Sequence, residues 1–301
     1  MSNALKSLTR SLFRWYLSQF PLRDGKAYFY EKFHPSLMPV ERLLTATLDQ
    51  GFKMKLDLED AEQRKVYFFG HYHERYEAAL VARILDPGEI CWDIGANVGY
   101  FSLVAAARLQ AAGQVVAFEP GAAALERLTE NVSLNPFKNI RIYHLAVADR
   151  DGEAVLYRAE GIADSSASLF AAAAGAAGGE ICVTIALDGF LKKENLAAPD
   201  FVKLDVEGAE LAALQGAAAI LADSRPLLLV EMEEKNLVAA GASKAAIQTF
   251  LADYGYCAAH LRKGRWHLID DVNLTRGRNL FWFNPEIPKH REKAGRVLNI
   301  S

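Results

Sequence analysis

The chain has 301 residues, of which 51% are hydrophobic, so it can form one large domain or a domain with a smaller attachment. Its 34 basic and 37 acidic residues give a net charge of −3, which argues against a dedicated nucleic-acid binder because such proteins usually carry a basic excess. Its three cysteines are widely separated and form no disulfide or metal-binding pattern, which favours a reducing compartment and predicts a cytoplasmic protein.

Residues 1–85 are predicted to form an N-terminal extension made of helices and a strand or hairpin. Residues 5–20 combine aromatic and basic side chains, as in an amphipathic helix. Such a helix either contacts a membrane surface or a partner, or packs on its own domain, and the second interpretation is favoured here. Residues 51–58 alternate apolar and polar side chains, which is typical of a half-exposed strand or hairpin, and residues 72–85 are predicted to be helical.

From residue 86 to residue 285, apolar runs alternate with helical stretches. This alternation predicts a Rossmann-like α/β domain with a mostly parallel, twisted sheet and helices on both faces. The last residues, 286–301, are rich in basic side chains and are predicted to be a tail. The predicted elements are strands at residues 90–94, 114–118, 140–145, 201–204, 226–230, 265–269 and 279–283, with helices between them, one of which covers residues 245–254.

A glycine loop, DIGANVG, lies between the first strand of this domain and an apolar helix. Gly95 and Gly99 allow a tight turn and a close approach of the backbone to a ligand, so that a side chain at Gly95 would block the ligand. The spacing differs from the GxGxxG of dinucleotide sites, and a carboxylate at Asp93 would repel a pyrophosphate. Asp93 suits the positive groups of S-adenosylmethionine (AdoMet), and Asp93, Gly95, Ala96, Asn97 and Gly99 are therefore predicted to bind this cofactor.

Two further positions complete the predicted cofactor site. Glu119 ends the second strand, where a carboxylate can accept hydrogen bonds from both ribose hydroxyls. The third strand runs into Ala146 with no acidic residue at its tip, so adenine is expected to contact backbone groups near this residue.

A second group of charged residues follows the strand at 201–204. Lys203 and Asp205 share one face of the strand and are expected to form an ion pair at its end, while Glu210 favours the start of the next helix. Asp205 is the leading candidate for a catalytic base, followed by Glu207 and by Glu231 at the same sheet edge. Alternatively, these carboxylates bind a divalent cation; whether a metal is used stays open.

The DIGANVG loop, the FEP turn after the second strand, KLDVEGAE and RPLLLVE together resemble the FkbM-type methyltransferases over roughly residues 70–283. Ser165, Ser166 and Ser168 resemble a serine-rich loop of that family. The resemblance implies a class I methyltransferase fold and AdoMet-dependent O-methylation of a hydroxyl on a sugar, a glycan or a hydroxylated natural product.

Two alternatives belong to other functional classes. A dinucleotide-dependent oxidoreductase of the NAD type would share the strand, loop and helix but would favour a third glycine. A non-catalytic module that binds AdoMet or a nucleoside would not need the carboxylates at Asp205 and Glu207.

Overall fold

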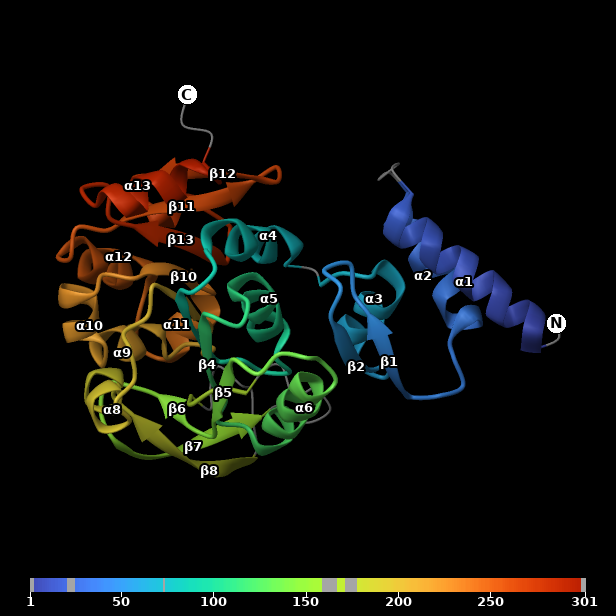
Figure 1. The fold of residues 1–301 in the computed structure, drawn as a ribbon, viewed down its shortest axis with the longest axis horizontal. Coiled ribbons are helices and arrows are strands. Elements are labelled where there is room, and N and C mark those ends of the chain that lie inside the picture. The colour runs from blue at the N-terminus through green and yellow to red at the C-terminus, as the bar shows by residue number, and fades with distance from the viewer. Residues whose placement is uncertain (1–2, 21–24, 73, 159–166, 171–177, 299–301) are drawn as a thin grey trace. The chain divides into compact units, whose positions relative to one another are not determined.

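The computed structural model describes residues 3–20, 25–72, 74–158, 167–170 and 178–298 (Figure 1). The chain divides into two compact units, residues 1–75 and 76–301. Helix α4 (Arg75–Ile84), which the sequence pattern assigned to the extension, belongs to the second unit from Tyr76 onward, and its apolar face is buried. None of the helices described is both long and apolar enough to cross a membrane.

The described residues of the first unit form three helices and a β-hairpin, which confirms the predicted helical and hairpin extension. The strands pair in antiparallel fashion with Ala46 opposite Met54, and the side chains of Met54 and Leu56 are fully buried. Alternation of apolar and polar residues therefore places one face of the hairpin against the helices. The elements are α1 (Asn3–Gln19), α2 (Lys26–Leu37), β1 (Leu43–Thr47), β2 (Lys53–Asp57) and α3 (Ala61–Phe69).

The second unit is built on an eight-stranded sheet with the order β12-β11-β13-β10-β9-β3-β4-β5. The five strands from β10 to β5 are parallel, and β13 pairs with β10 in antiparallel fashion. This arrangement confirms the predicted Rossmann-like fold of class I methyltransferases. The strands are β3 (Ile90–Ile94), β4 (Gln114–Phe118), β5 (Ile140–Tyr143), β9 (Phe201–Leu204), β10 (Leu227–Glu231), β11 (Cys257–Arg262), β12 (Arg265–Ile269) and β13 (Asn279–Phe283).

The strand order reverses at β3. From β3 the chain adds β4 and then β5 on one side, and it later returns to place β9 on the other side of β3. In open α/β sheets, ligands bind at the carboxyl ends of the strands at such a switch point. The loops after β3 and β9 are therefore the expected place for a functional site.

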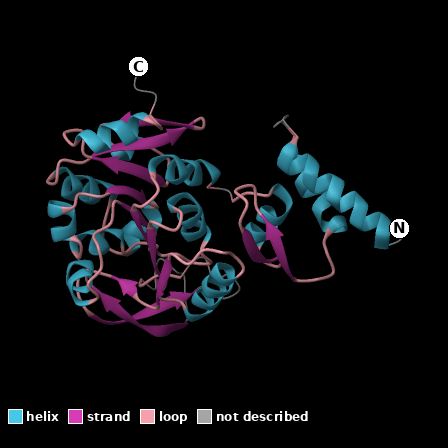
Figure 2. Cartoon of the chain, viewed as in Figure 1, coloured by secondary structure: helices cyan, strands magenta, loops and turns pink. Residues whose placement is uncertain are grey.

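Helices cover both faces of the sheet (Figure 2). On one face, Trp92, Phe118 and Trp282 belong to a large apolar core shared with the helices from α8 to α12. On the other face, Ala117 packs against Leu128 of α6. The helices of this unit, besides α4, are α5 (Tyr100–Leu109), α6 (Ala122–Ser133), α8 (Leu187–Lys193), α9 (Glu210–Gln215), α10 (Ala218–Asp223), α11 (Glu234–Ala239), α12 (Lys244–Ala252) and α13 (Pro288–Gly295), with a 3-10 turn at Val272–Leu274.

A separate three-stranded sheet, which the sequence pattern did not predict, follows β5. It consists of β6 (Ala146–Val147), β8 (Gly178–Ile185) and β7 (Gly152–Arg158), in that spatial order. The predicted third strand, at residues 140–145, is therefore β5, which ends at Tyr143, and the chain then enters this second sheet.

The predicted basic tail contains helix α13. Pro288 lies in its first turn, where the missing N–H of proline costs nothing. Lys293 is buried, with its Nζ 2.5 Å from a carboxylate oxygen of Glu89 and 3.2 Å from one of Asp86. Lys293 therefore forms buried ion pairs with Asp86 and Glu89, and this segment is not a free tail. Its helix α13 packs against the domain.

Candidate functional site

The glycine loop after β3 turns the chain sharply into α5. Gly95 and Gly99 have φ values of +76° and +91°, and Asn97 between them has +49°. The N–H groups of Gly95 and Ala96 both donate to the carbonyl oxygen of Phe118 at 3.0 Å, which fixes the loop to the end of β4. The side-chain Oδ1 of Asn97 is buried and accepts no hydrogen bond within the described part of the chain, so it is an available acceptor for a ligand N–H.

Gly95 lies against the second loop of the site. A Cβ at this position would be 1.8 Å from the backbone carbonyl oxygen of Asp205. The sequence pattern predicted that a side chain at Gly95 would block a ligand, but the nearest obstacle is the protein's own backbone. Glycine is required here because two loops, one after β3 and one after β9, touch through their main chains.

Glu119, at the end of β4, is buried and holds the backbone of two turns. Its Oε2 accepts from the N–H of Asn97 at 2.7 Å, and its Oε1 accepts from the N–H of Gly121 at 2.8 Å. Burial raises the pKa of this carboxyl to about 7, although both backbone donors favour the ionised form. Each carboxylate oxygen still has a second lone pair, so the predicted acceptance of ribose hydroxyls fits this geometry.

Asp93 lies inside β3 and is 1% exposed. Its Oδ2 accepts from the hydroxyl of Ser102, in the first turn of α5, at 2.6 Å, and its Oδ1 is 3.9 Å from Nζ of Lys203. Burial raises the pKa of Asp93, and the charge of Lys203 opposes this effect. Asp93 therefore stabilises the glycine loop through its contacts with Ser102 and Lys203. A direct contact of Asp93 with the positive groups of the cofactor stays a prediction.

Lys203 joins the two loops electrostatically. It is adjacent to Asp93 in the parallel register of β3 and β9. Its Nζ lies 2.9 Å from Oδ2 of Asp205, which confirms the ion pair expected for two residues on one face of the strand. The same Nζ donates to the carbonyl oxygen of Gly95 at 3.3 Å and lies 5.0 Å from the centroid of the Phe101 ring. This buried cation thus has partners on both sides of the switch point.

The loop after β9 takes an unusual backbone path before α9 begins. Glu207 has a φ of +51° and Gly208 a φ of +112°. The buried carboxylate of Glu210 accepts hydrogen bonds from the N–H groups of Val206 and Gly208, at distances of 3.1 to 3.2 Å. Glu210 therefore does more than favour the helix dipole, since it closes the loop that presents Asp205 and Glu207.

Two residues that the sequence pattern did not assign to the site hold Glu207. The side-chain amide of Asn236, in α11, donates to Oε2 of Glu207, and the hydroxyl of Ser168 donates to its backbone oxygen at 2.6 Å. Only the resemblance pointed toward Ser168; the neighbouring Ser165 and Ser166 lie outside the described residues. No sequence signal marked Asn236, because its position depends on the packing of α11 next to this loop.

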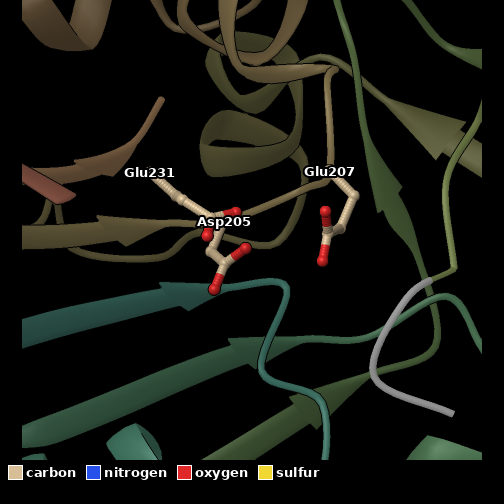
Figure 3. A group of neighbouring side chains, drawn as sticks. All are labelled: Asp205, Glu207 and Glu231. Atoms are coloured by element: carbon tan, nitrogen blue, oxygen red, sulfur yellow. The ribbon is translucent and has the colours of Figure 1, made fainter. Parts of the chain in front are cut away.

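Three carboxylates meet at the switch point (Figure 3). Asp205, Glu207 and Glu231 each offer an oxygen, and these oxygens all lie within 4.8 Å of one another. Burial raises the pKa of Glu207 to about 7, and the negative charges of Asp205 and Glu210 add to this effect. Such a group can take a proton near neutral pH, and the oxygens also have the chemistry of ligands for a hard divalent cation.

Ala146 lies in the second sheet, where its register partner is Thr184. Its side chain is buried against Leu156 and Cys182. Only its backbone could therefore contact an adenine ring, and this role stays a prediction.

Comparison with known proteins identifies the group to which these loops belong. A family model described as the methyltransferase FkbM domain matches residues 93–257. Hexuronic acid methyltransferase AglP of Haloferax volcanii is 28% identical over 146 residues, which cover 47% of this chain and 56% of that protein. The chain thus matches about half the length of this relative.

Solved structures with a related fold include methyltransferase FkbM from Methylobacillus flagellatus KT, at 15% identity and a TM-score of 0.44, with 66% of this chain and 44% of that chain covered. M. jannaschii TYW2 in complex with AdoMet aligns at 16% identity and a TM-score of 0.44, over 82% of this chain and 89% of that chain. Because the family model spans more than half of the 301 residues and includes both loops of the site, the chain belongs to the FkbM family of methyltransferases.

Proposed function

We propose that the second unit is the catalytic domain and that it transfers the methyl group of AdoMet to a hydroxyl of a sugar, a glycan or a hydroxylated natural product. The observation that carries this proposal is the group of three carboxylates beside the glycine loop at the switch point. The named substrate of the relative AglP, a hexuronic acid, supports a sugar hydroxyl as the acceptor. An oxidoreductase of the NAD type does not fit a member of a methyltransferase family.

Different residues of the site would bind the cofactor and accept the proton. The glycine loop, with the free Oδ1 of Asn97 and the carboxylate of Glu119, would hold AdoMet, whose sulfonium supplies an electrophilic methyl group. Asp205 is the leading candidate to accept the acceptor's proton, since its carboxylate ends up beside the glycine loop, 2.9 Å from Nζ of Lys203, and Glu207 is the second. The methyl carbon–sulfur bond breaks as the oxygen–carbon bond forms, and the proton goes to the carboxylate.

A divalent cation at Asp205, Glu207 and Glu231 is the second form of this proposal. The oxygen donors suit magnesium, which would lower the pKa of a bound hydroxyl. Against it, Lys203 already offsets the charge of Asp205, and Asn236 already donates to Glu207. We therefore favour the carboxylates as base and orienting groups.

A methyl-transfer screen over uronic acids, glycans and hydroxylated small molecules tests the proposal, with release of S-adenosylhomocysteine as the readout. Uronic acids and other sugars are expected to be methylated on oxygen, which mass spectrometry of the product identifies. Methylation of a nitrogen or carbon acceptor alone would contradict the proposal. Tight AdoMet binding without turnover on any acceptor would instead favour the non-catalytic module.

Glu119→Gln is expected to weaken AdoMet binding by about 1.5–3 kcal/mol, the scale of a hydrogen-bond set to a charged group. Gln keeps one acceptor oxygen for the backbone donors of Asn97 or Gly121, so the loop is disturbed less than by Ala. Calorimetry with AdoMet and with its 2′,3′-dideoxy analogue separates the ribose contact from loop support. If the loss of binding free energy caused by the variant and the loss caused by the analogue simply add, Glu119 does not hold the ribose.

AdoMet binding is expected to tighten as the pH rises through about 7, because the buried carboxyl of Glu119 must ionise to accept ribose hydroxyls.

The free energy of unfolding of the cofactor-free protein should decrease over the same rise in pH. The folded pKa values of Glu119, Glu207 and Glu210 are raised to about 7, so their stabilising protonation is lost as the pH rises through that value. Melting curves with and without AdoMet measure both effects, and an affinity that falls with rising pH would contradict this role of Glu119.

A further inference from the structure

Glu207 has a backbone conformation that its side chain disfavours. Its φ of +51° lies in the left-handed region, where a residue with a Cβ is strained, and Gly208 follows with a φ of +112°. A glycine in place of Glu207 would make the same turn without strain, so the turn alone does not account for a glutamate here. Strained residues of this kind cluster at functional sites, and what glutamate adds is a carboxylate beside Asp205 and Glu231 (Figure 3).

Ser168 fixes the main chain of Glu207. Its hydroxyl donates to the backbone oxygen of Glu207 at 2.6 Å, and the residue is 1% exposed. The backbone of Ser168 is itself held by Tyr157 of β7, through one hydrogen bond in each direction, at 2.8 and 3.0 Å. The small sheet therefore supports the strained backbone of Glu207, but this contact does not fix the torsions of the glutamate side chain.

Asn236 fixes the side chain of Glu207. It is 3% exposed and is the third residue of α11, and its Nδ2 donates to Oε2 of Glu207. A Cβ at Gly208 would lie 2.8 Å from the backbone oxygen of Asn236, so the loop and the helix touch through their main chains and keep this donor in place. Helix α11 follows β10, which ends at Glu231. Asn236 therefore ties the carboxylate of Glu207 to the segment that carries Glu231.

The hydrogen bond from Asn236 engages one oxygen of this carboxylate and leaves the other available. Within the described part of the chain, Oε1 of Glu207 accepts no hydrogen bond. An amide is a neutral donor, so it orients the carboxylate without offsetting its charge, in contrast to Lys203 beside Asp205. A carboxylate with a fixed plane and one open oxygen is the arrangement that aligns an acceptor hydroxyl.

We propose that Asn236 is a positioning residue for methyl transfer, which holds Oε2 of Glu207 so that Oε1 keeps one orientation toward the acceptor hydroxyl. This role rests on the proposed function, because it requires Glu207 to act on the acceptor. If Asn236 only packed α11 onto the loop, its replacement would lower stability and leave the orientation of the carboxylate unchanged. The two roles therefore differ in their effect on a variant that stays folded.

Asn236→Leu keeps the volume of the side chain and removes the donor. We expect it to lower the single-turnover rate of methyl transfer about a hundredfold, the effect of a small displacement of a reacting group, while AdoMet affinity changes less than about twofold. The acceptor is the one with the fastest turnover in the methyl-transfer screen. In a Glu207→Gln background the same substitution should change the rate less than about twofold, because no carboxylate is left to orient. Equal rate losses in the two backgrounds would overturn the proposal.

Asn284→Leu is the matched control. Asn284 is 4% exposed, and its Nδ2 donates to the backbone oxygen of Tyr254 at 3.1 Å. It follows β13, which is antiparallel to β10, so it lies at the sheet edge opposite the three carboxylates. Its replacement should lower stability and leave the rate unchanged. Circular dichroism verifies that each variant is folded, and Asn236→Ala takes the place of Asn236→Leu if the leucine variant does not fold.

Crystal structures of the wild type and of Asn236→Leu test the positioning without turnover. The carboxylate of Glu207 is expected to leave its place beside Asp205 and Glu231 in the variant. A carboxylate that keeps its wild-type position overturns the proposal, whatever the rates. Absence of methyl transfer by the wild type would overturn the proposed function instead, and the two crystal structures would then still show whether Asn236 orients this carboxylate.

Discussion

Gly95→Ala is expected to destabilise the protein by at least about 3 kcal/mol and to abolish AdoMet binding. The added Cβ would lie 1.8 Å from the carbonyl oxygen of Asp205, and the backbone at Gly95 has a φ of +76°. The cofactor loop would have to move away from the loop that carries Asp205, which would also break the contact of Lys203 with the Gly95 carbonyl. Chemical denaturation and titration calorimetry measure the two losses.

Gly241→Ala is the matched control for this variant. Gly241 has a φ of +75°, and a Cβ there would meet no atom within 4 Å. It therefore carries the same backbone strain without the collision, and should cost about 1 kcal/mol with AdoMet affinity retained. Equal stability losses in the two variants would mean that the close approach of the loops contributes nothing. Wild-type AdoMet affinity in Gly95→Ala would remove Gly95 from the cofactor site.

Much of the sheet could be predicted because its strands are short, mostly apolar runs next to strong turn signals. The strand at 201–204 and the two aromatic strands at 265–269 and 279–283 have the predicted bounds. Strand β11 was missed because Cys257–Arg262 contains two alanines and no β-branched residue. Its conformation is imposed by its neighbours, since it lies between β12 and β13 in the sheet.

The small sheet was missed for a different reason. The segment 171–179, rich in alanine and glycine, was interpreted as a loop, and the strands on either side of it were overlooked. Residues 171–177 lie outside the described part, while Gly178 and Gly179 begin β8. In β8, Ile181 is 75% exposed, so alternating apolar residues there do not mark a buried face.

The site shows what a linear pattern can and cannot reveal. Asp205, Glu207 and Glu231 could be grouped from the sequence because parallel strands end at one sheet edge, and their oxygens do lie together. The support of Glu207 by Asn236 depends on how a short helix returns to the sheet, which no local spacing encodes. The roles of these residues in catalysis and binding stay predictions, which substitutions at Gly95, Glu119 and Asp205 test.

Asp205→Asn is expected to lower the rate of methyl transfer by about 10²–10⁴, while AdoMet affinity changes little. Asn preserves the size of the side chain and one acceptor oxygen, but it cannot take a proton. Single-turnover methylation and calorimetry on one preparation measure rate and affinity separately.

The same substitution also tests the structural alternative, in which Asp205 only neutralises Lys203. Loss of one partner of a buried ion pair costs roughly 3–5 kcal/mol. Asp205→Asn should cost less, because Lys203 keeps Asp93 at 3.9 Å and the carbonyl of Gly95 at 3.3 Å. A variant that melts several degrees lower but transfers methyl at the wild-type rate would make Asp205 structural.

Asp200→Asn is the control, because Asp200 precedes the same strand β9 at its opposite end. Its carboxylate also pairs with a lysine, with 2.7 Å between Oδ1 and Nζ of Lys289, and it accepts from the N–H of Ile90. Its replacement should lower stability and leave the rate unchanged.

A chelator then separates a base from a cation ligand. We expect EDTA to leave wild-type turnover unchanged, because Lys203 and Asn236 already engage two of the three carboxylates. If EDTA stops turnover and magnesium restores it, Asp205 acts as a ligand, and the rate loss in Asp205→Asn should then diminish at high magnesium concentration. A base lost by substitution is not recovered by magnesium, so the two roles of Asp205 give opposite responses to the same titration.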